Sequence, residues 1–425
     1  MSKFNFLLNT FLFRTIHYAS LTWDKREWCI ALKALRGSQN TDEIENLERE
    51  ICRLTGSKYA VAYNYGRSAI QVALQSYNFP LKCEVILPSF CCTGVIMPVI
   101  QAGLTPVLVD IDNDFNIRAE SVREAITEKT CAIILPHLSG KFANDTQQIL
   151  QIAKNHGLIV IEDACQAFGL VVDGKMAGSF GDVGIFSFGG CKTFLGSGGG
   201  ILFTNDNKVI SYCQSNILRK EETRPVKKRL YQFMWRYGLQ RILYPFIIPH
   251  YLFNKVRYRI NQGLSNIPVE IDSLENYRFN LYAIDPIEAA LAYSQLKRAE
   301  EIVNKMSENA KIIISANILS QIGLQTSNST NHNFSKLLVT TGKDRERSRS
   351  IISFLRDSGI ETESSYTPLH LRKPFTCFRH TSMIITDNLW PGAFYLPNNS
   401  CLNNNHMNKI IKVLKNYSRA RSERP

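Results

Sequence analysis

The sequence predicts an α/β protein with a mostly parallel sheet, followed by a smaller C-terminal α/β unit. Short runs of β-branched and aromatic residues alternate with helical stretches from about residue 58 to residue 206. Such alternation is typical of a parallel sheet covered by helices. The alternation then stops, and mixed strand and helix patterns return over about 320–425. The length of 425 residues suits two or three domains of roughly 100–200 residues each.

Seven apolar runs are the candidate strands of the large sheet, and helical patterns fill several of the gaps between them. The runs are 59–63, 84–87, 106–110, 131–135, 158–162, 184–188 and 200–203. The clearest helices between them are 68–77, 119–126 and 146–155. A long helical pattern at 287–319 leads into the smaller unit. We therefore divide the chain into an N-terminal arm (1–41), a large domain (42–285), and a bridging helix with the small domain (286–425).

The N-terminal arm carries two local signals. Phe4, Leu7, Leu8 and Phe11 have the i, i+3, i+4, i+7 spacing of a short amphipathic helix. Thr41 then precedes an acidic run, whose charges suit the start of a helix.

Charge is concentrated in one segment. Residues 219–259 contain eleven Lys or Arg and two acidic residues, which gives +9 of the net charge of +13. A local excess of this kind does not predict a nucleic-acid-binding protein, because no recognised binding module accompanies it. The eleven cysteines are scattered, without C-x-x-C or metal-ligand spacing, and indicate free thiols in a reducing compartment. We expect no metal site, no signal peptide and no membrane-spanning helix.

The most informative stretch runs from Val160 to Asp206. Asp163 ends an apolar run, where open α/β sheets form ligand crevices. Lys192 follows the 184–188 run among glycines. Such a lysine is usually a solvated surface residue, but together with a strand-end acid it indicates pyridoxal phosphate (PLP). That cofactor needs a lysine that binds it covalently and a carboxylate beside its pyridine nitrogen.

These segments resemble the signature of the DegT/StrS group of nucleotide-sugar aminotransferases, which are fold-type I PLP-dependent enzymes. The resemblance rests on VIEDACQAFG (160–169), GSFGDVGIFSF (178–188) and Lys192, and it continues in EVILPSF (84–90), PHLSG (136–140) and YTPLH (366–370). A related group of sugar dehydratases has histidine in place of Lys192, so the lysine favours the aminotransferases.

The resemblance implies specific roles. Lys192 would hold the cofactor and then act as the acid and base that moves the substrate proton. Asp163 would pair with the pyridine nitrogen, Gln166 would lie beside the phenolic oxygen, and Ser187 would bind the phosphate. Gly66 opens a helix whose N–H groups would bind the same phosphate.

Four further positions bear on the cofactor. Arg67 stands where the family has a small hydroxyl residue, and would either contact the phosphate or pack nearby. Cys92 falls where the family places an aromatic ring over the cofactor, so stacking would be lost or supplied by His137. His137 could equally be an ordinary core histidine. The Asn-Tyr-Arg element, which in the family reaches the neighbouring subunit's phosphate, lies about five residues early here, at 276–278, and Leu281-Tyr-Ala283 occupies the expected place.

The basic and aromatic insertion at 222–262 has two open interpretations. Mixed cationic and aromatic residues over 224–260 suit a membrane interface, and would dock the enzyme on the cytoplasmic leaflet. Alternatively, the insertion is a helical excursion that packs against a partner subunit.

The sequence thus predicts a cytoplasmic PLP-dependent aminotransferase, a homodimer by resemblance, that moves an amino group from glutamate to a nucleotide-linked keto-sugar for glycan or secondary-metabolite synthesis. The alternatives are an aminotransferase acting on a lipid-linked sugar and a non-catalytic PLP-fold scaffold or regulator at the membrane surface.

Overall fold

The computed structural model describes residues 15–20, 22–36, 42–190, 192–194, 196–217, 224–235, 279–327 and 330–422. The predicted helix at Phe4–Phe11, the segment 236–262 and the Asn-Tyr-Arg element at 276–278 lie outside these residues.

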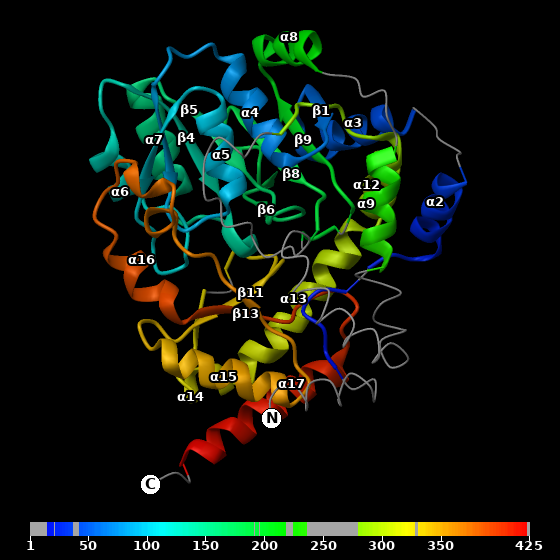
Figure 1. The fold of residues 1–425 in the computed structure, drawn as a ribbon, viewed down its shortest axis with the longest axis vertical. Coiled ribbons are helices and arrows are strands. Elements are labelled where there is room, and N and C mark those ends of the chain that lie inside the picture. Colours follow the sequence, from blue (N-terminus) through cyan, green and yellow to red (C-terminus); the bar gives the residue numbers. More distant parts are fainter. Residues whose placement is uncertain are drawn as a thin grey trace, which may run out of the picture.

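A seven-stranded sheet forms the centre of the large unit (Figure 1). Its order is β1 (Tyr59–Tyr63), β9 (Gly200–Thr204), β8 (Val183–Ser187), β5 (Ile159–Asp163), β4 (Thr130–Pro136), β2 (Glu84–Pro88) and β3 (Thr105–Val109). Only β9 runs antiparallel to its neighbours; the other pairs are parallel. The sequence prediction of a mostly parallel sheet is therefore confirmed, and each predicted strand lies within one or two residues of the observed one.

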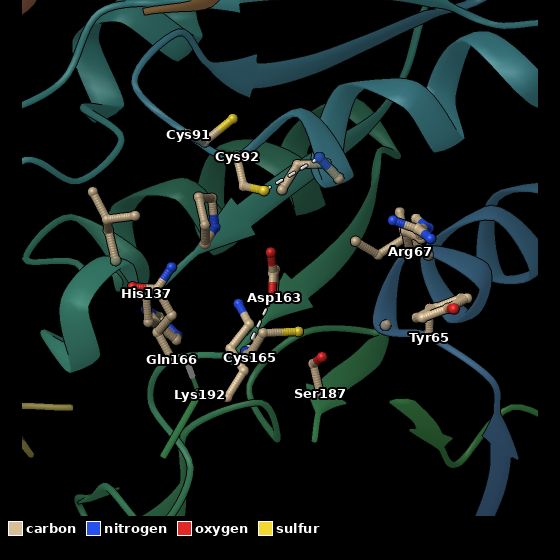
Figure 2. Close-up of a pocket in the computed structure, with 16 residues that line it drawn as sticks. Tyr65, Arg67, Cys91, Cys92, His137, Asp163, Cys165, Gln166, Ser187 and Lys192 are labelled. Carbon is tan, nitrogen blue, oxygen red and sulfur yellow. Dashed lines mark hydrogen bonds between the residues drawn. The ribbon is translucent and has the colours of Figure 1, made fainter. Parts of the chain in front are cut away.

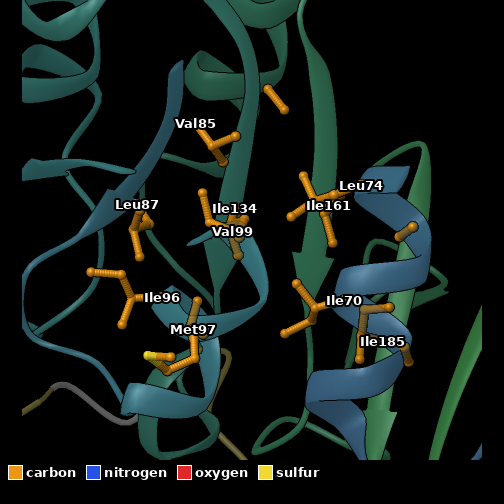
Figure 3. Packing of buried hydrophobic residues seen from close by; sticks show 14 of the residues in the cluster. Ile70, Leu74, Val85, Leu87, Ile96, Met97, Val99, Ile134, Ile161 and Ile185 are labelled. Carbon is orange, nitrogen blue, oxygen red and sulfur yellow. The ribbon is translucent and has the colours of Figure 1, made fainter. Parts of the chain in front are cut away.

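Helices cover both faces of this sheet, because alternate residues of each buried strand point to opposite sides. Helices α4 (Gly66–Ser76), α5 (Thr93–Gln101) and α8 (Asn207–Asn216) cover one face. Figure 3 shows this core, where Ile70 and Leu74 of α4 and Val99 of α5 meet Ile134 and Ile161 of the strands. Helices α6 (Ala119–Ala125) and α7 (Thr146–His156) cover the other face.

The predicted helical pattern at 287–319 is divided into three helices. They are α12 (Pro286–Leu296), α13 (Ala299–Ser315) and α14 (Ile318–Gln321). The start of α12 is well defined. The Asp285 side chain caps it by accepting a hydrogen bond from the N–H of Ile287, and Pro286 occupies the first turn. Helix α12 packs with α3 (Asp42–Thr55) against the β1–β9 edge of the sheet.

A second, antiparallel sheet of four strands forms the smaller unit. Its order is β10 (Gln325–Thr326), β11 (Leu337–Thr340), β13 (Ala393–Leu396) and β12 (Glu363–Ser364). Helices α13, α15 (Arg345–Asp357) and α17 (Asn404–Ser422) bury a common core against it (Figure 1). The shorter elements are β6 (Val171–Val172), β7 (Lys175–Met176), α16 (Ile384–Leu389) and the 3-10 turns Leu138–Gly140, Leu369–Leu371, Phe375–Cys377 and Trp390–Gly392.

The N-terminal arm connects the two units. Ile16 pairs with Ile360 in a parallel bridge beside the small sheet. Helix α2 (Lys25–Leu35) then packs on α12; it was not predicted, although Asp24 and Glu27 form a complete capping box at its start. Helix α9 (Arg224–Met234), from the predicted insertion, lies against both: Leu230, Phe233 and Met234 are buried on α2 and α12.

Candidate active site

The carboxyl ends of β4, β5 and β8 meet at a cavity of about 160 Å³ (Figure 2). Parallel strands bring these ends to one edge of the sheet, and the register places Pro136 of β4 beside Asp163 of β5. Residues far apart in the sequence therefore share one wall. All seven predicted site residues line the cavity: Gly66, Arg67, His137, Asp163, Gln166, Ser187 and Lys192.

Asp163 and Lys192 point into the same cavity from different segments (Figure 2). Asp163 is the last residue of β5 and is 8% exposed. Its Oδ1 accepts a hydrogen bond from the N–H of Cys165 at 3.0 Å, which orients the carboxylate. Lys192 lies between β8 and β9, in a segment that we call the lysine loop. Its described residues are 188–190, 192–194 and 196–199.

Gln166 is fixed at both ends of its amide group. Its Oε1 accepts from the N–H of Ser139 at 2.9 Å, and its Nε2 donates to Oη of Tyr366 at 3.2 Å. Ser139 has a φ of 61°, a conformation uncommon for a side-chain-bearing residue, so the turn after β4 is shaped to present this donor. Tyr366 lies in the YTPLH segment, and no local pattern predicted its contact with Gln166.

Both ring nitrogens of His137 are hydrogen-bonded within the protein. Its Nδ1 accepts from the N–H of Ala143 at 3.1 Å, so Nε2 carries the proton that it donates to Glu162 Oε1 at 2.7 Å. Its ring stacks on Phe142, with centroids 4.5 Å apart. Its side chain is wholly buried, as the core-histidine alternative predicts, and it also lines the cavity, where the stacking alternative would place it.

Glu162 precedes Asp163 and is a structural residue that sequence reasoning missed. Besides His137, its carboxylate accepts from the N–H groups of Gly178, Phe180 and Gly181 at 2.6 to 2.9 Å. Burial alone would raise the pKa of Glu162, but the hydrogen bond from His137 and the backbone N–H donors lower it below its usual value. Glu162 thus connects β5 to the turn after β4 and to the segment 178–181.

The start of α4 forms a cradle next to Ser187. Its N-cap residue, Tyr65, makes no capping side-chain hydrogen bond, so the first turn of this 11-residue helix is left open toward the cavity. A Cβ added at Gly66 would lie 3.0 Å from Cβ of Ser187, and one at Gly200 would lie 2.2 Å from N of Gly66. Glycine is required at Gly200, and a side chain at Gly66 would crowd Ser187. The two glycines thus leave N–H groups and a hydroxyl around a space that suits a phosphate.

Arg67 stacks at the rim of this cradle. Its guanidinium carbon lies 4.1 Å from the ring centroid of Tyr65 and 5.2 Å from that of Phe279. The segment that contains Phe279 runs beside β1, where Ala283 pairs with Tyr63 and the N–H of Asn64 donates to O of Tyr282. Arg67 therefore packs on two aromatic rings, and it also borders the predicted phosphate position.

Three cysteines, Cys91, Cys92 and Cys165, line the cavity. Cys92 caps α5, since its Sγ accepts from the N–H of Gly94 at 3.4 Å. Cys165, which the sequence analysis did not select, is buried, and burial raises the pKa of its thiol well above the usual value. Cys92 and Cys165 both have small side chains, so they leave room in the cavity.

The residues present fit PLP. The lysine, the strand-end carboxylate and the glycine cradle beside Ser187 lie around one cavity, as the cofactor's aldehyde, pyridine nitrogen and phosphate require. In the part of the chain that the structure describes, no cluster of three or more His, Cys, Asp or Glu side chains could hold a metal ion.

Comparisons with known proteins agree with this fold. A protein from Streptococcus pneumoniae, described as a sugar aminotransferase and solved in its PLP form, superposes with a TM-score of 0.72 at 19% identity, over 96% of this chain and 99% of that one. GDP-perosamine synthase from Vibrio cholerae is 26% identical over 88% of this chain and 90% of its own length. A pleiotropic regulatory protein from Geobacillus stearothermophilus is 38% identical, but the match spans 43% of this chain and 49% of that protein.

The fold and the site together define an aminotransferase. The chain belongs to the DegT/DnrJ/EryC1/StrS aminotransferase family, whose model matches residues 26–237 and 254–415. The unmatched segment, 238–253, falls inside the predicted insertion. Among the described residues, no helix has both the length and the apolar character needed to cross a membrane.

Proposed function

We propose that this enzyme uses PLP to move an amino group from glutamate to a nucleotide-linked keto-sugar. The observation that carries the proposal is the joint placement of Lys192, Asp163 and the Gly66–Ser187 cradle around one cavity. The similarity to the GDP-perosamine synthase of Vibrio cholerae supports a nucleotide-linked sugar as the acceptor.

Each residue has a defined task in this proposal. PLP, when bound, supplies an electron sink for the carbon that gains or loses the amino group. Lys192 holds the cofactor and moves the proton through its Nζ. The Asp163 carboxylate favours a protonated pyridine nitrogen. The amide of Gln166, fixed by Ser139 and Tyr366, lies where the resemblance places the phenolic oxygen.

We also propose a homodimer, on the family resemblance, and a cytoplasmic location, which the free thiols of the described cysteines support. Membrane binding through 224–260 is not part of the proposal. The apolar residues Leu230, Phe233 and Met234 are buried on the chain's own α2 and α12, so in the described part of the insertion they are not available to a bilayer.

The visible absorption spectrum of the purified protein, titrated with PLP, tests the proposal. We expect a protein-bound cofactor band that excess glutamate removes as 2-oxoglutarate is released. Lys192→Ala should form neither the band nor 2-oxoglutarate, whereas Lys208→Ala, at the exposed start of α8, should behave as the wild type. A colourless wild type in excess PLP, or an unaffected Lys192→Ala variant, would contradict the proposal. A GDP-linked keto-sugar is the first acceptor to supply.

A further inference from the structure

Helix α9, which belongs to the predicted insertion, forms an ion pair with a buried glutamate of the large unit. Arg229 Nη2 lies 2.9 Å from Oε1 of Glu288, which belongs to α12. The Glu288 side chain is 0% exposed and that of Arg229 is 27% exposed. The two helices lie side by side in Figure 1, and Leu230 beside this pair packs with Ile287 and Leu291 of α12.

The same glutamate oxygen contacts the lysine loop. Ser197 Oγ donates to Glu288 Oε1 at 3.0 Å. At Gly198 an added Cβ would lie 2.6 Å from that oxygen, so the loop backbone passes directly over the carboxylate. Two backbone hydrogen bonds complete the arrangement: the N–H of Gly196 donates to O of Phe188 at 2.9 Å, and the N–H of Gly199 donates to O of Asn64 at 2.8 Å.

Arg229 also lies near Tyr65, which lines the cavity. Its guanidinium carbon lies 5.7 Å from the ring centroid of Tyr65, the residue that precedes Gly66 and stacks on Arg67. One side chain of the insertion thus contacts the glutamate under the lysine loop and the aromatic ring at the phosphate cradle.

The glutamate depends on this arginine electrostatically. Burial raises the pKa of Glu288, and the charge and hydrogen bond of Arg229 oppose that rise. Its Oε2 is buried without a hydrogen-bond partner among the described residues. Without Arg229, Ser197 would be the remaining described donor to a buried carboxylate, an arrangement that is strongly unfavourable. The lysine loop would have to move to let water reach the charge.

We propose that Arg229 is a positioning residue, which holds the lysine loop against Glu288 so that Lys192 faces the cavity. The insertion is then a support of the cofactor site. This inference rests on the proposed role of Lys192, but its structural half, the restraint of the loop, can be measured without any cofactor.

The test uses Arg229→Met in the full chain, with two measurements. Hydrogen exchange of the apoprotein should show the Gly196 and Gly199 amides exchanging about tenfold faster than in the wild type, and the dissociation constant for PLP should rise about tenfold, the equivalent of roughly 1.4 kcal/mol. Adding Glu288→Gln removes the buried charge and should restore both values to within about threefold of the wild type. If Arg229→Met fails to fold, the double variant is measured alone. Wild-type exchange and PLP affinity in it would support the role of the buried Glu288 charge, and faster exchange with weaker PLP binding would overturn it.

The chain offers a matched control at the other end of α12. Glu27 has a side chain that is 0% exposed and accepts from Arg298 Nη2 at 2.8 Å and from Ser294 Oγ. Arg298→Met should therefore lower the unfolding temperature without changing loop exchange or PLP affinity. The inference is overturned if Arg229→Met lowers the unfolding temperature without changing loop exchange or PLP affinity. It is also overturned if the double variant does not regain the wild-type values. If the wild type binds no PLP, the proposed function fails, and the exchange measurement alone decides whether Arg229 restrains the loop.

Discussion

His137 donates a hydrogen bond to Glu162 across 2.7 Å, and neither side chain is exposed to solvent. This contact links the turn after β4 to the residue before Asp163. Because the glutamate also accepts from three backbone N–H groups, its four donors fix the carboxyl end of β5. The acid proposed to face the cofactor is therefore positioned from behind by its own neighbour in the chain.

Glu162→Gln should be strongly destabilising. The amide would bring an NH₂ group to a place where only N–H donors point, so at least one buried donor would lose its acceptor. We expect a loss of about 3 kcal/mol in the free energy of unfolding, measured with denaturant. The exposed pair Glu120–Arg123 provides the control, and Glu120→Gln should cost less than about 0.5 kcal/mol. Equal effects of the two substitutions would show that the four donors do not stabilise the site.

Gly66→Ala should weaken the binding of PLP through its phosphate. The new methyl would lie 3.0 Å from Cβ of Ser187 and 3.3 Å from Sγ of Cys165, so it would narrow the cradle at the start of α4. We expect the dissociation constant for PLP to rise at least about tenfold. Pyridoxal, which has no phosphate, supplies the control ligand, and its affinity should change little. A parallel loss for both ligands would place the phosphate elsewhere.

The position of Asp163 was predictable because it ends an apolar strand. Asp163 ends β5, and a parallel sheet brings such ends to one edge whatever the details of packing. The role of Ser187, which ends β8, was predicted from the family resemblance instead. The same argument explains why strand positions were accurate: continuous apolar β-branched runs are typical of strands buried on both faces.

The remainder depends on contacts between distant residues that no local pattern encodes. Arg229 meets Glu288 across 59 residues of sequence, and Gln166 meets Tyr366 across 200. The role of His137 could not be decided either, because its partner Glu162 becomes its neighbour only when β4 pairs with β5. Helix α2 is a different case, since its capping box at Asp24 and Glu27 was readable and was overlooked.

His332 should make the protein less stable at acidic pH. Its Nδ1 accepts from the N–H of Phe334 at 2.9 Å, and burial, with the nearby charge of Lys141, lowers its pKa from 6.5 to about 3. The folded state therefore binds fewer protons than the unfolded state below pH 6.5, and stability falls as the pH drops from 6.5 toward 3. The slope from this residue approaches about 1.4 kcal/mol per pH unit.

His332→Asn keeps an acceptor for the Phe334 N–H but cannot be protonated. Its difference in unfolding free energy from the wild type should shrink as the pH is lowered from 7 to 4, by denaturant unfolding at each pH. Phe334→Leu disturbs the same stack, whose ring centroids lie 3.9 Å apart, without removing a titrating group, and its difference should stay constant with pH. A constant difference for His332→Asn as well would contradict the assignment.

Glu48 should make the protein less stable as the pH rises, the opposite of the effect of His332. It lies on α3, where its Oε1 accepts from the N–H of Ala62 in β1 at 2.8 Å, and burial raises its pKa from 4.5 to about 7. The folded state holds this proton more tightly than the unfolded state, so the stability that it contributes is present in full below pH 4.5 and is lost as the pH rises through about 7.

Glu48→Gln retains the acceptor for Ala62 and does not titrate, so its stability relative to the wild type should increase between pH 4.5 and pH 7 and level off above. The change should be on the order of 1 kcal/mol per pH unit at most. Glu45 raises the pKa of Glu48 by its charge, and Glu45→Gln should therefore move the wild-type transition to lower pH. Urea unfolding of the three proteins across this range provides the measurement. A relative stability of Glu48→Gln that falls with rising pH would show that the buried carboxyl is ionised throughout and is stabilised by the β1 backbone.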